Sequence, residues 1–401
     1  MKKSSIILLM LFLFASIAPF FWLKFKDSQE KKDGGSFYQT FFSSLGWDDK
    51  ENIKYIPEKK EQKSEISGNI YYVSPNGKKE AEGLSPENAL GTIQDAVDKA
   101  QPGDGVMLLE GEYFQDFVSA RNGLKEKPIT IYGSSKAVIK GSGKNSRIIE
   151  INHDYIFLKG FSVDGLSGDA SDKKNYRDKL IYVQGKEKNK GVTGLQIKEM
   201  TIKNAGGECI RLRYFAQENE ISHNVIKNCG VYDFLFDGKG KNGEGIYIGT
   251  APEQLDDNKN PTSDRDKSDN NWIHHNEIDT QGNECVDIKE GSSKNLVEYN
   301  KCTGQKDDNS AGFDSRGNGN IFRYNESYGN VGAGIRLGGD EKDDGIDNIV
   351  IENKLHDNKG GGIKIEQEPQ GVICGNIFSD NKKGNIVGEY AKKVKNATKC
   401  N

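Results

Sequence analysis

The segment GNECVDIKEGS, residues 282–292, places three ionisable side chains within six residues of a stretch that alternates like a β-strand. These side chains are Glu284, Asp287 and Lys289. Carboxylates that gather at one place can hold a hard cation such as Ca²⁺, and a lysine beside them can bind an anion or exchange a proton. The segment therefore contains the parts of a site, provided that neighbouring segments add similar groups at the same place.

The C-terminal half of the chain repeats a short frame, apolar–x–x–Asn–x–apolar. Examples are EISHNVIKN, WIHHNEIDT, LVEYNKCTG, IFRYNESYG, IVIENKLHD and VICGNIFSD. Their central asparagines are Asn224, Asn276, Asn300, Asn325, Asn353 and Asn376. From Asn276 onward, successive asparagines are 23 to 28 residues apart, and a near-constant period of this length is typical of a solenoid.

The repeat units are short runs rich in β-branched residues between turn residues, and they lack the 3.6-residue period of a helix. They are therefore predicted to be strands. Asparagines stacked at equivalent turns can hydrogen-bond to one another from coil to coil. The sequence predicts an all-β domain, a single-stranded right-handed parallel β-helix whose coils stabilise their neighbours.

One segment ahead of the repeats has a different pattern. Residues 91–114 begin with Ile93, Ala96, Val97 and Ala100 on one helical face and continue as a strand. We expect an amphipathic helix here that caps the N-terminal end of the β-helix, where core and strand edges would otherwise be exposed.

A second repeating strand precedes each asparagine frame. When these strands are aligned on their apolar pairs, the intervening side chains face solvent and form two columns across the coils. The first column contains Arg211, Tyr247, Asp287, Asp314, Arg336 and Lys364. The second contains Arg213, Gly249, Lys289, Arg316, Gly338 and Glu366, and the strand entrances carry Glu208, Glu244 and Glu284.

Lys289 and Arg316 would then be neighbours on adjacent coils, about 4.8 Å apart along the stack. Two like charges at this distance repel each other by about 3 kcal/mol at an effective dielectric constant near 20, whereas a purely structural face would alternate charge signs. We therefore expect an anionic ligand over the basic groups and a cation on the entrance glutamates. Five glycines are expected to flatten this face for a long polymer: Gly245, Gly249, Gly312, Gly334 and Gly338.

Two stretches of the chain resemble known β-helix proteins. Residues 71–113, YYVSPNGKKEAEGLSPENALGTIQDAVDKAQPGDGVMLLEGEY, resemble the opening of many secreted members of the pectin-lyase-like superfamily of right-handed parallel β-helices. The series NGEGIYIGT, NECVDIKEGS, AGFDSRGN and GAGIRLGG, within residues 240–340, resembles the polysaccharide lyase family that includes chondroitinase B and alginate lyases. That family has a Glu-x-x-x-x-Lys strand, an Arg on the next coil and a Gly-Ile-Arg strand after it, which correspond here to Glu284–Lys289, Arg316 and Arg336.

This resemblance implies cleavage of a uronic-acid-containing glycan by Ca²⁺-assisted β-elimination. Lys289 would remove the C5 proton, and Arg316 would lower the pKa of that lysine and stabilise the departing oxygen. The expected Ca²⁺ ligands are Glu244 and Glu284, followed by Glu208 and Asp287. The expected substrate-binding residues are Arg211, Arg213, Tyr247, Asp314 and Arg336.

The chain departs from the family pattern at two places. Gly282 stands where chondroitinase-type enzymes have a second acidic residue, and Arg316-Gly317-Asn318 stands in place of the family's Arg-His-Gly. Two other functions stay open on the sequence. One is a C5-epimerase of a uronate polymer, with Tyr247 as its second acid, and the other is a non-catalytic surface β-helix that binds glycans.

Composition limits the partners. The chain has 56 basic and 60 acidic residues and a formal net charge of −4, so no overall field favours nucleic acid. An apolar fraction of 34% with 47 glycines suits a repetitive β architecture, in which each coil buries few side chains. We expect a monomer whose partner is an acidic polysaccharide.

The N-terminus predicts export. Residues 1–23 carry Lys2 and Lys3 near their start and continue as an apolar run, which is typical of a signal peptide or a membrane anchor. Residues 24–66 are predicted to be a charged tether, and residues 67–401 the β-helix domain. The protein is therefore expected to be secreted or anchored on the outer side of the cytoplasmic membrane.

Two further features are left open by the sequence. Cys209 and Cys229, and likewise Cys285 and Cys302, are spaced to meet after one coil, either as disulfides or as small buried residues. The hydrophilic insertion 251–271 is expected to be a long loop beside the two columns, which either walls a groove, binds a cation or has neither role.

Overall fold

The computed structural model describes residues 59–61, 65–238, 240 and 242–400. Within it, Lys59–Cys400 form one compact unit. The predicted signal or anchor and most of the predicted tether lie outside the described residues. None of the helices in the described part is long and apolar enough to cross a membrane.

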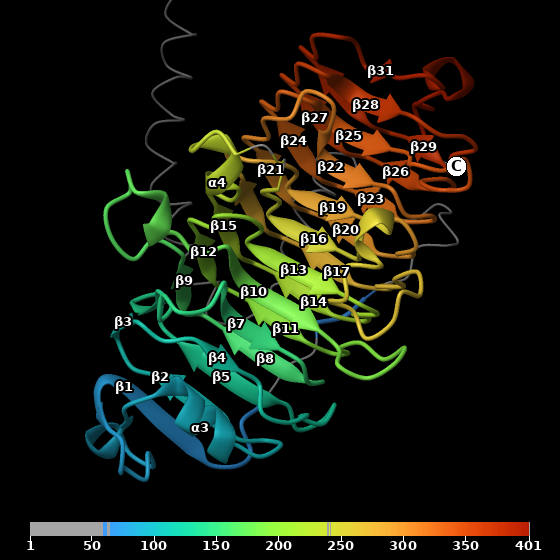
Figure 1. The fold of residues 1–401 in the computed structure, drawn as a ribbon. Coiled ribbons are helices and arrows are strands. Elements are labelled where there is room, and N and C mark those ends of the chain that lie inside the picture. The colour runs from blue at the N-terminus through green and yellow to red at the C-terminus, as the bar shows by residue number, and fades with distance from the viewer. Residues whose placement is uncertain (1–58, 62–64, 239, 241, 401) are drawn as a thin grey trace, which may run out of the picture. The chain divides into compact units, whose positions relative to one another are not determined.

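The described chain winds into a β-helix with three long sheets, here named A, B and C, to which the coils contribute short strands in turn (Figure 1). Successive strands of each sheet come from successive coils and pair in parallel. This arrangement confirms the predicted right-handed parallel β-helix.

Sheet A contains β1 (Ile70–Lys78), β2 (Gly105–Leu108), β5 (Ile129–Gly133), β8 (Ile156–Lys159), β11 (Gln196–Lys198), β14 (Glu220–Ser222), β17 (Trp272–His274), β20 (Leu296–Glu298), β23 (Ile321–Arg323), β26 (Ile349–Ile351) and β29 (Ile373–Cys374). Sheet B contains β3 (Gly111–Tyr113), β6 (Ala137–Ile139), β9 (Ser162–Asp164), β12 (Thr201–Lys203), β15 (Val225–Lys227), β18 (Glu277–Asp279), β21 (Lys301–Thr303), β24 (Glu326–Tyr328), β27 (Lys354–His356) and β30 (Ile377–Ser379). Sheet C contains β4 (Phe117–Val118), β7 (Arg147–Ile151), β10 (Lys179–Gln184), β13 (Ile210–Arg213), β16 (Ile246–Ile248), β19 (Val286–Ile288), β22 (Ala311–Ser315), β25 (Ala333–Leu337), β28 (Gly361–Ile365) and β31 (Ile386–Val387). The helices are α3 (Ile93–Lys99) and α4 (Val231–Phe234), and the 3₁₀ turns are η1 (Pro86–Asn88), η2 (Lys173–Asn175), η3 (Pro252–Gln254) and η4 (Ala391–Lys393).

The coils of sheet C stack in the predicted register. The inward-facing residues that pair from coil to coil are Ile210, Ile246, Val286, Phe313, Ile335 and Ile363. All of them are buried in the central core. Because side chains alternate along a strand, the residues next to them project from the outer face of sheet C at the same height in every coil.

The asparagine frame is two strands and not the single strand that the sequence suggested. In EISHNVIKN, β14 ends at Ser222 and β15 begins at Val225, and His223 between them has φ 58°. A residue in this left-handed region turns the chain sharply. Each coil therefore has three strands where the sequence predicted two.

Asparagine side chains join the coils at this bend. Asn224 donates from its backbone N–H and from Nδ2 to Asn276 Oδ1, at 3.0 and 2.9 Å. The same ladder continues through Asn300, Asn325, Asn353, Asn376 and Asn396. Two more ladders, which the sequence analysis missed, stand at the other corners: Asn219, Asn271, Asn295, Asn320 and Asn348 before sheet A, and Gln305, Asn330, Asn358 and Asn381 after sheet B.

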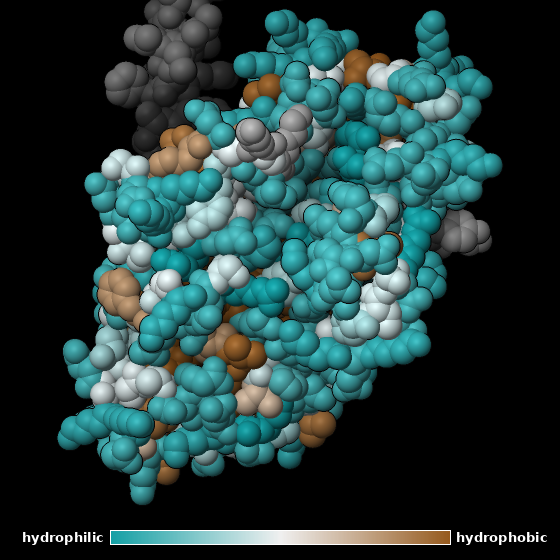
Figure 2. Space-filling view, viewed as in Figure 1, coloured by the Kyte–Doolittle hydropathy of each residue, from teal (hydrophilic) through white to brown (hydrophobic). Residues whose placement is uncertain are grey.

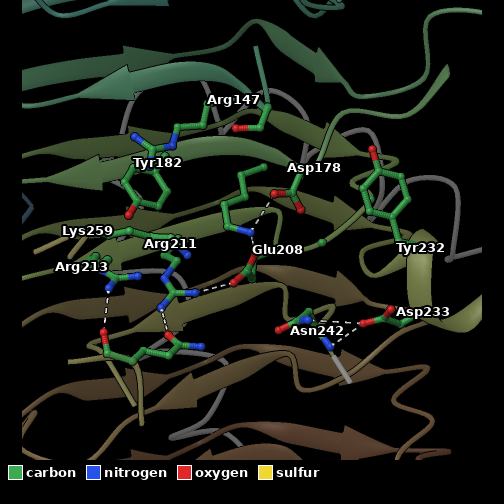
Figure 3. Close-up of a pocket in the computed structure, with 15 residues that line it drawn as sticks. Arg147, Asp178, Tyr182, Glu208, Arg211, Arg213, Tyr232, Asp233, Asn242 and Lys259 are labelled. Atoms are coloured by element: carbon green, nitrogen blue, oxygen red, sulfur yellow. Dashed lines mark hydrogen bonds and ion pairs between the residues drawn. The ribbon is translucent and has the colours of Figure 1, made fainter. Parts of the chain in front are cut away.

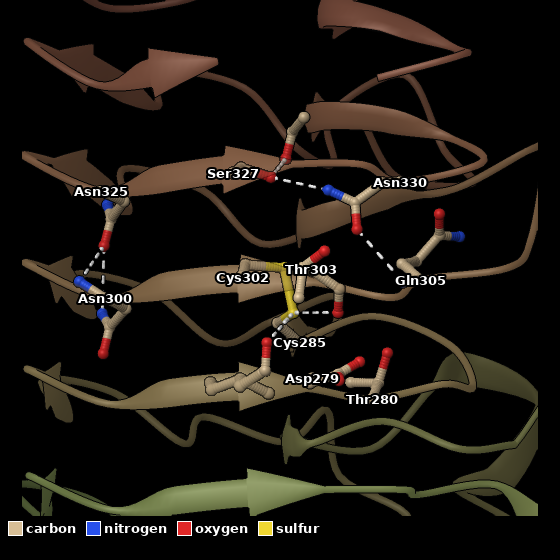
Figure 4. Close-up of a disulfide and its surroundings, with 12 residues drawn as sticks. Asp279, Thr280, Cys285, Asn300, Cys302, Thr303, Gln305, Asn325, Ser327 and Asn330 are labelled. Carbon is tan, nitrogen blue, oxygen red and sulfur yellow. Dashed lines mark hydrogen bonds between the residues drawn. A yellow bond between two sulfur atoms is a disulfide. The ribbon is translucent and has the colours of Figure 1, made fainter. Parts of the chain in front are cut away.

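The described residues contain three disulfides. Both predicted pairs, Cys209–Cys229 and Cys285–Cys302, are bonded, and Cys374–Cys400 forms a third bond that was not predicted. In Figure 4 the second of these bonds lies beside the Asn300–Asn325 and Gln305–Asn330 ladder contacts. The alternative of unpaired buried cysteines does not hold in the described residues.

The short helix α3 forms within the segment that predicted a helix. Thr92 accepts a hydrogen bond from the Asp95 backbone N–H at 3.1 Å, which caps the first turn. The apolar residues of the predicted helical face are buried. They pack against β1, β2 and β4, the first strands of sheets A and C, so α3 covers apolar surface at the N-terminal end of the stack.

The ladder predicts the cost of removing one asparagine. In Asn300→Ala, the N–H of Asn276 and the carbonyl groups of Ile273 and Glu298 lose their buried partners. Since each unpaired buried group costs about 1–3 kcal/mol, we expect unfolding free energy to fall by about 3 kcal/mol in urea titrations followed by circular dichroism. Asn76→Ala, at an exposed position, is the control and should change it by less than about 0.5 kcal/mol. Equal effects of the two changes would contradict the ladder's role.

Candidate functional site

The outer face of sheet C carries the two predicted columns. The first column runs in paired register through Arg211, Tyr247, Asp287, Asp314, Arg336 and Lys364. Ile288 pairs with Ser315, so the residues that follow them, Lys289 and Arg316, are neighbours on adjacent coils, as predicted. Hydrophilic residues make up most of the surface seen in Figure 2.

Three carboxylates meet at the entrance to this face. One oxygen each of Glu244, Glu284 and Asp287 lies within 4.8 Å of the other two, and all three side chains are buried. Glu284 Oε2 and Asp287 Oδ1 have no hydrogen-bond partner among the described residues. A buried oxygen without a partner is costly, and a bound cation would offset that cost. We call these three residues the carboxylate cluster.

The members of the carboxylate cluster disfavour one another's charge. Burial, together with the charges of Glu208 and Asp287, raises the pKa of Glu244 to about 7. Burial, together with Asp287 and Glu244, raises the pKa of Glu284 well above its usual value. The other oxygen of Glu284, Oε1, accepts a hydrogen bond from Ser310 Oγ. The sequence analysis did not single out Ser310. Ionisation of Glu244 and Glu284 is thus disfavoured by their burial and by the neighbouring carboxylates.

Glu208, the remaining entrance glutamate, has two cationic partners. Lys179 Nζ lies 2.6 Å from Glu208 Oε2, and Arg211 Nη1 lies 2.6 Å from Oε1. Although burial opposes ionisation, these two charges lower the pKa of Glu208 to about 2. Glu208 is therefore the ionised partner of two bases, and the structure does not bring it into the carboxylate cluster.

Lys289 forms an ion pair within its own strand segment. Its Nζ lies 2.8 Å from Asp287 Oδ2 and 4.9 Å from the centre of the Tyr247 ring. Burial and the nearby Arg316 both lower the pKa of Lys289, but Asp287 and Glu284 outweigh them and raise it well above its usual value. The expectation that Arg316 brings this pKa toward neutrality is wrong, because the direct contact with Asp287 favours the charged amine.

The other basic residues of the face are neutralised by the chain itself. Arg316 Nη1 lies 2.9 Å from Asp340 Oδ1 and 3.6 Å from Glu290 Oε1. Arg336 Nη1 donates to both oxygens of Asp314, at 3.0 and 3.1 Å. Acidic side chains thus relieve the expected repulsion between basic groups, so an anionic ligand is not needed for that purpose. Of the two ligands expected from the sequence, an anion over the basic groups and a cation on the acidic groups, the charge distribution still favours only the cation.

The 251–271 insertion is held against the face by Arg213. This arginine donates to Asn260 Oδ1 at 2.5 Å and pairs with Asp257 Oδ1 at 2.8 Å, and it is buried. Asp266 anchors the other end of the insertion by accepting the backbone N–H of residues 214 and 215 at 2.7 and 2.8 Å. Of the roles left open for the insertion, the structure therefore fits a wall beside the columns, and Arg213 positions that wall.

A pocket of 380 Å³ lies between this wall and sheet C (Figure 3). Its polar lining includes Arg147, Asp178, Lys179, Tyr182, Glu208, Arg211, Tyr232, Asp233, Asn242, Gln254 and Lys259. The sequence analysis missed Lys179 and Tyr182, which lie on β10 one coil before the first aligned strand. The signal was present, because Ile181 and Val183 form the same alternating apolar pair and Tyr182 pairs with Arg211.

Packing explains why Gly282 departs from the chondroitinase-type pattern. A Cβ atom at this position would lie 2.1 Å from the carbonyl oxygen of Cys229. No side chain fits in this backbone arrangement, so the second acidic residue of the family has no place here. Asp287 supplies the third carboxylate of the cluster instead.

Two of the five predicted face glycines lie on the outer face. Gly249 and Gly338 have φ of 95° and 139°, which favour glycine, and a Cβ on Gly249 would lie 3.3 Å from Lys289 Cβ. At the other three a Cβ would meet buried backbone and side-chain atoms of neighbouring strands and turns: Gly245, Gly312 and Gly334. For these three the expectation of a flattening role is wrong, because the inner side of the strand needs the space.

Sequence comparison assigns no function. No family model matches the chain. An uncharacterised protein of Bacillus subtilis (strain 168), YwoF, is 31% identical over 142 residues, which make up 33% of this chain and 29% of YwoF. The chain thus spans less than a third of the curated relative that it matches.

Comparison of structures finds the same fold in an alginate lyase, a pectate lyase and a bacteriophage tailspike protein. An alginate lyase from Paenibacillus sp. str. FPU-7 superimposes with a TM-score of 0.60 at 21% identity, covering 74% of this chain and 95% of that one. Pectate lyase Pel9A gives a TM-score of 0.55 at 14% identity, covering 80% and 78%. The full-length tailspike protein 2 of an Escherichia coli O157:H7 bacteriophage gives 0.51 at 12% identity, covering 80% and 41%. At these identities the likeness establishes the parallel β-helix fold.

The opposite environments of two glutamates predict opposite effects on stability. Glu208→Gln removes the partner of Lys179 and Arg211, and breaking a buried ion pair costs about 3 kcal/mol. Glu284→Gln removes a charge that its neighbours disfavour, so stability should stay the same or rise. The free energy of unfolding of both variants, measured at pH 7 with a chelator present, tests these two expectations.

A drop in pH should remove the contribution of Glu208 to stability. The pKa of Glu208 is lowered, so its contribution is present above pH 4.5 and is lost as the pH falls toward 2. Similar losses in Glu208→Gln and Glu284→Gln at pH 7 would contradict the charge distribution described above.

Proposed function

We propose that this protein is a polysaccharide lyase that cleaves a uronic-acid-containing glycan by β-elimination. The observation that carries the proposal is the carboxylate cluster on the same sheet face as Lys289, with Arg316 on the next coil. Similarity of fold to an alginate lyase and a pectate lyase supports this class of reaction.

The carboxylate cluster suits Ca²⁺. This hard cation prefers carboxylate oxygens, and Glu244, Glu284 and Asp287 offer oxygens of which two lack a partner among the described residues. Glu208 stays with its two basic partners and would act only through its charge. When bound, Ca²⁺ would neutralise the substrate carboxylate and so make the C5 proton more acidic.

The residues of the chain would divide the reaction between them. Neutral Lys289 accepts the C5 proton, the electrons of that C–H bond form the C4=C5 double bond, and the C4–O bond breaks. Arg316 stabilises the negative charge on the leaving oxygen, which then takes a proton from water. Because Asp287 raises the pKa of Lys289, the neutral amine is scarce at pH 7, and the rate should rise with pH through the alkaline range.

The pocket beside the carboxylate cluster would hold further sugar units. Its cationic lining residues Arg147 and Lys259, whose side chains are 26% and 62% exposed, suit carboxylate groups on the polymer. Lys179 is engaged by Glu208. Arg213 is engaged by the 251–271 insertion and Asp314 by a neighbouring arginine. We therefore assign these last two residues to positioning their neighbours rather than to contact with the substrate.

Export to the outside of the cell is part of the proposal. The substrate is a polymer found outside cells, and the three disulfides are typical of an oxidising compartment. Residues 1–23 would act as a signal peptide or as an anchor on the outer side of the cytoplasmic membrane. The protein would act as a monomer.

The lyase proposal predicts a new absorbance from unsaturated uronate when the protein is incubated with alginate, pectate, chondroitin or dermatan. The signal should require Ca²⁺ and should fall by about 10²–10⁴-fold in Lys289→Ala, the range typical of a lost general base. Lys301→Ala, at an exposed position on sheet B, is the control and should keep full activity. Full activity in Lys289→Ala, or no product from the unaltered protein on any of these polymers, would refute the proposal.

Calcium affinity should rise with pH through about 7. Below this value Glu244 carries a proton that the cation must displace, so apparent affinity should fall toward tenfold per pH unit as the pH drops. Calorimetric titration with Ca²⁺ across this range measures the slope. Glu244→Gln should bind more weakly and show a flatter profile, and a flat profile for the unaltered protein would remove Glu244 from the site.

A C5-epimerase is the second candidate because of Tyr247. Its hydroxyl group is buried without a hydrogen-bond partner among the described residues, and burial raises its pKa, so it keeps its proton. An epimerase needs such an acid to return a proton to C5. Deuterium incorporation from solvent without new absorbance, and its loss in Tyr247→Phe, would assign this activity. Glycan binding with neither signal would identify the non-catalytic β-helix.

A further inference from the structure

Three of the chain's five histidines meet at the bend between sheets A and B, away from sheet C. They are His223, which follows β14, and His274 and His275 on the next coil, where His274 ends β17 and His275 follows it. The His223 ring lies 5.5 Å from the His274 ring and 4.9 Å from the His275 ring, centre to centre. His274 Nδ1 lies 2.8 Å from His275 Nδ1. Such a gathering of imidazoles has no part in the proposed lyase reaction.

A carboxylate from a distant part of the sequence completes the group. Glu61 lies beside these coils, and one ligand atom each of Glu61, His223 and His274 lies within 4.8 Å of the other two. Lys198 Nζ holds Glu61 in this place at 3.0 Å, and the neighbouring Lys59 donates to the carbonyl oxygen of Asn270 at 2.6 Å. The segment 59–61 therefore lies against sheet A, several coils from the start of the β-helix at β1.

The tautomer of His274 suits a metal ligand. Its Nε2 lies 3.0 Å from Glu220 Oε1, and a carboxylate acceptor requires that this nitrogen carry the hydrogen. The lone pair is then on Nδ1, where it accepts a hydrogen bond from His275 Nδ1 at 2.8 Å. An ion on this nitrogen would take the place of that hydrogen bond. A carboxylate that holds the outer N–H of a ligating histidine is the usual second partner at protein metal sites.

An ion has access to this group, and two of its ligands have room to adjust. His274 is fully buried, whereas the side chains of His223 and Glu61 are 41% and 45% exposed, so an ion can enter past these two. Bonds of about 2.0–2.1 Å to a tetrahedral ion require the ligand atoms to approach more closely than 4.8 Å, and the two exposed side chains have the freedom to move. Glu61 would exchange its contact with Lys198 for the ion.

We propose that Glu61, His223 and His274 form a binding site for a late first-row divalent cation, with Zn²⁺ as the best match. Imidazole nitrogen suits Zn²⁺, Cu²⁺ and Ni²⁺, whereas Ca²⁺ prefers oxygen alone. The site is thus chemically distinct from the carboxylate cluster on sheet C. Ion binding would tie the segment 59–61, which lies near the end of the predicted tether, to sheet A.

The test is calorimetric titration of the chelator-treated full chain with Zn²⁺, with Co²⁺ absorption as a check on tetrahedral nitrogen coordination. One equivalent should bind, and affinity should fall by at least about tenfold in His223→Asn. Asparagine is chosen because residue 223 has φ 58°, a conformation that asparagine adopts readily. It also lacks the imidazole that would bind the ion. Glu61→Gln should also weaken binding, since it removes the anionic ligand.

Matched controls separate this site from other histidines and from the lyase site. His356→Ala and Glu284→Gln should leave Zn²⁺ affinity unchanged, because neither residue belongs to this group. Unchanged affinity in His223→Asn, or the absence of binding by the unaltered chain, would overturn the proposal. Loss of affinity in Glu284→Gln would also overturn it, by placing the Zn²⁺ in the carboxylate cluster.

Discussion

The stacking of one coil on the next determines everything else in this structure. Parallel backbone hydrogen bonds fix the register between coils, and the asparagine ladders satisfy the turn groups that the strands leave unpaired at each corner. A shift by one residue would turn every outward side chain inward. Because the register holds, residues far apart in the sequence, such as Glu244, Asp287 and Arg316, come to lie on one face.

The charges on that face are sorted rather than evenly mixed. Basic residues have acidic partners within hydrogen-bonding distance, as in Arg336 with Asp314, while Glu244 and Glu284 share a buried space with another carboxylate. Pairing all of the charges would stabilise the fold more than this arrangement does. Buried carboxyl groups that disfavour one another's charge are stable when they hold a proton or bind a cation, and a cation is the ligand with the required charge.

Much of this could be predicted from the sequence because β-strands alternate strictly. The inward-facing pairs, both columns and the neighbouring positions of Lys289 and Arg316 follow from spacing alone. Spacing also predicts that Cys209 meets Cys229 and that Cys285 meets Cys302, although it leaves open whether they are bonded. The pairing of charges does not, since it depends on loops whose path spacing does not fix: Arg316 meets Asp340, and Arg213 meets Asp257. The left-handed residue that splits each asparagine frame, and the raised pKa of Lys289, likewise depend on local geometry that one repeat does not reveal.

The central claim is that the carboxylate cluster holds a cation beside Lys289 and Arg316. A crystal structure of the protein grown with Ca²⁺, or with Mn²⁺ for its anomalous signal, tests this most directly. The account predicts an ion about 2.3–2.6 Å from oxygens of Glu244, Glu284 and Asp287 when Ca²⁺ is bound, with Lys289 and Arg316 side by side on the same face. An ion bound elsewhere while the carboxylate cluster stays empty, or these two side chains on different sheets, would contradict it.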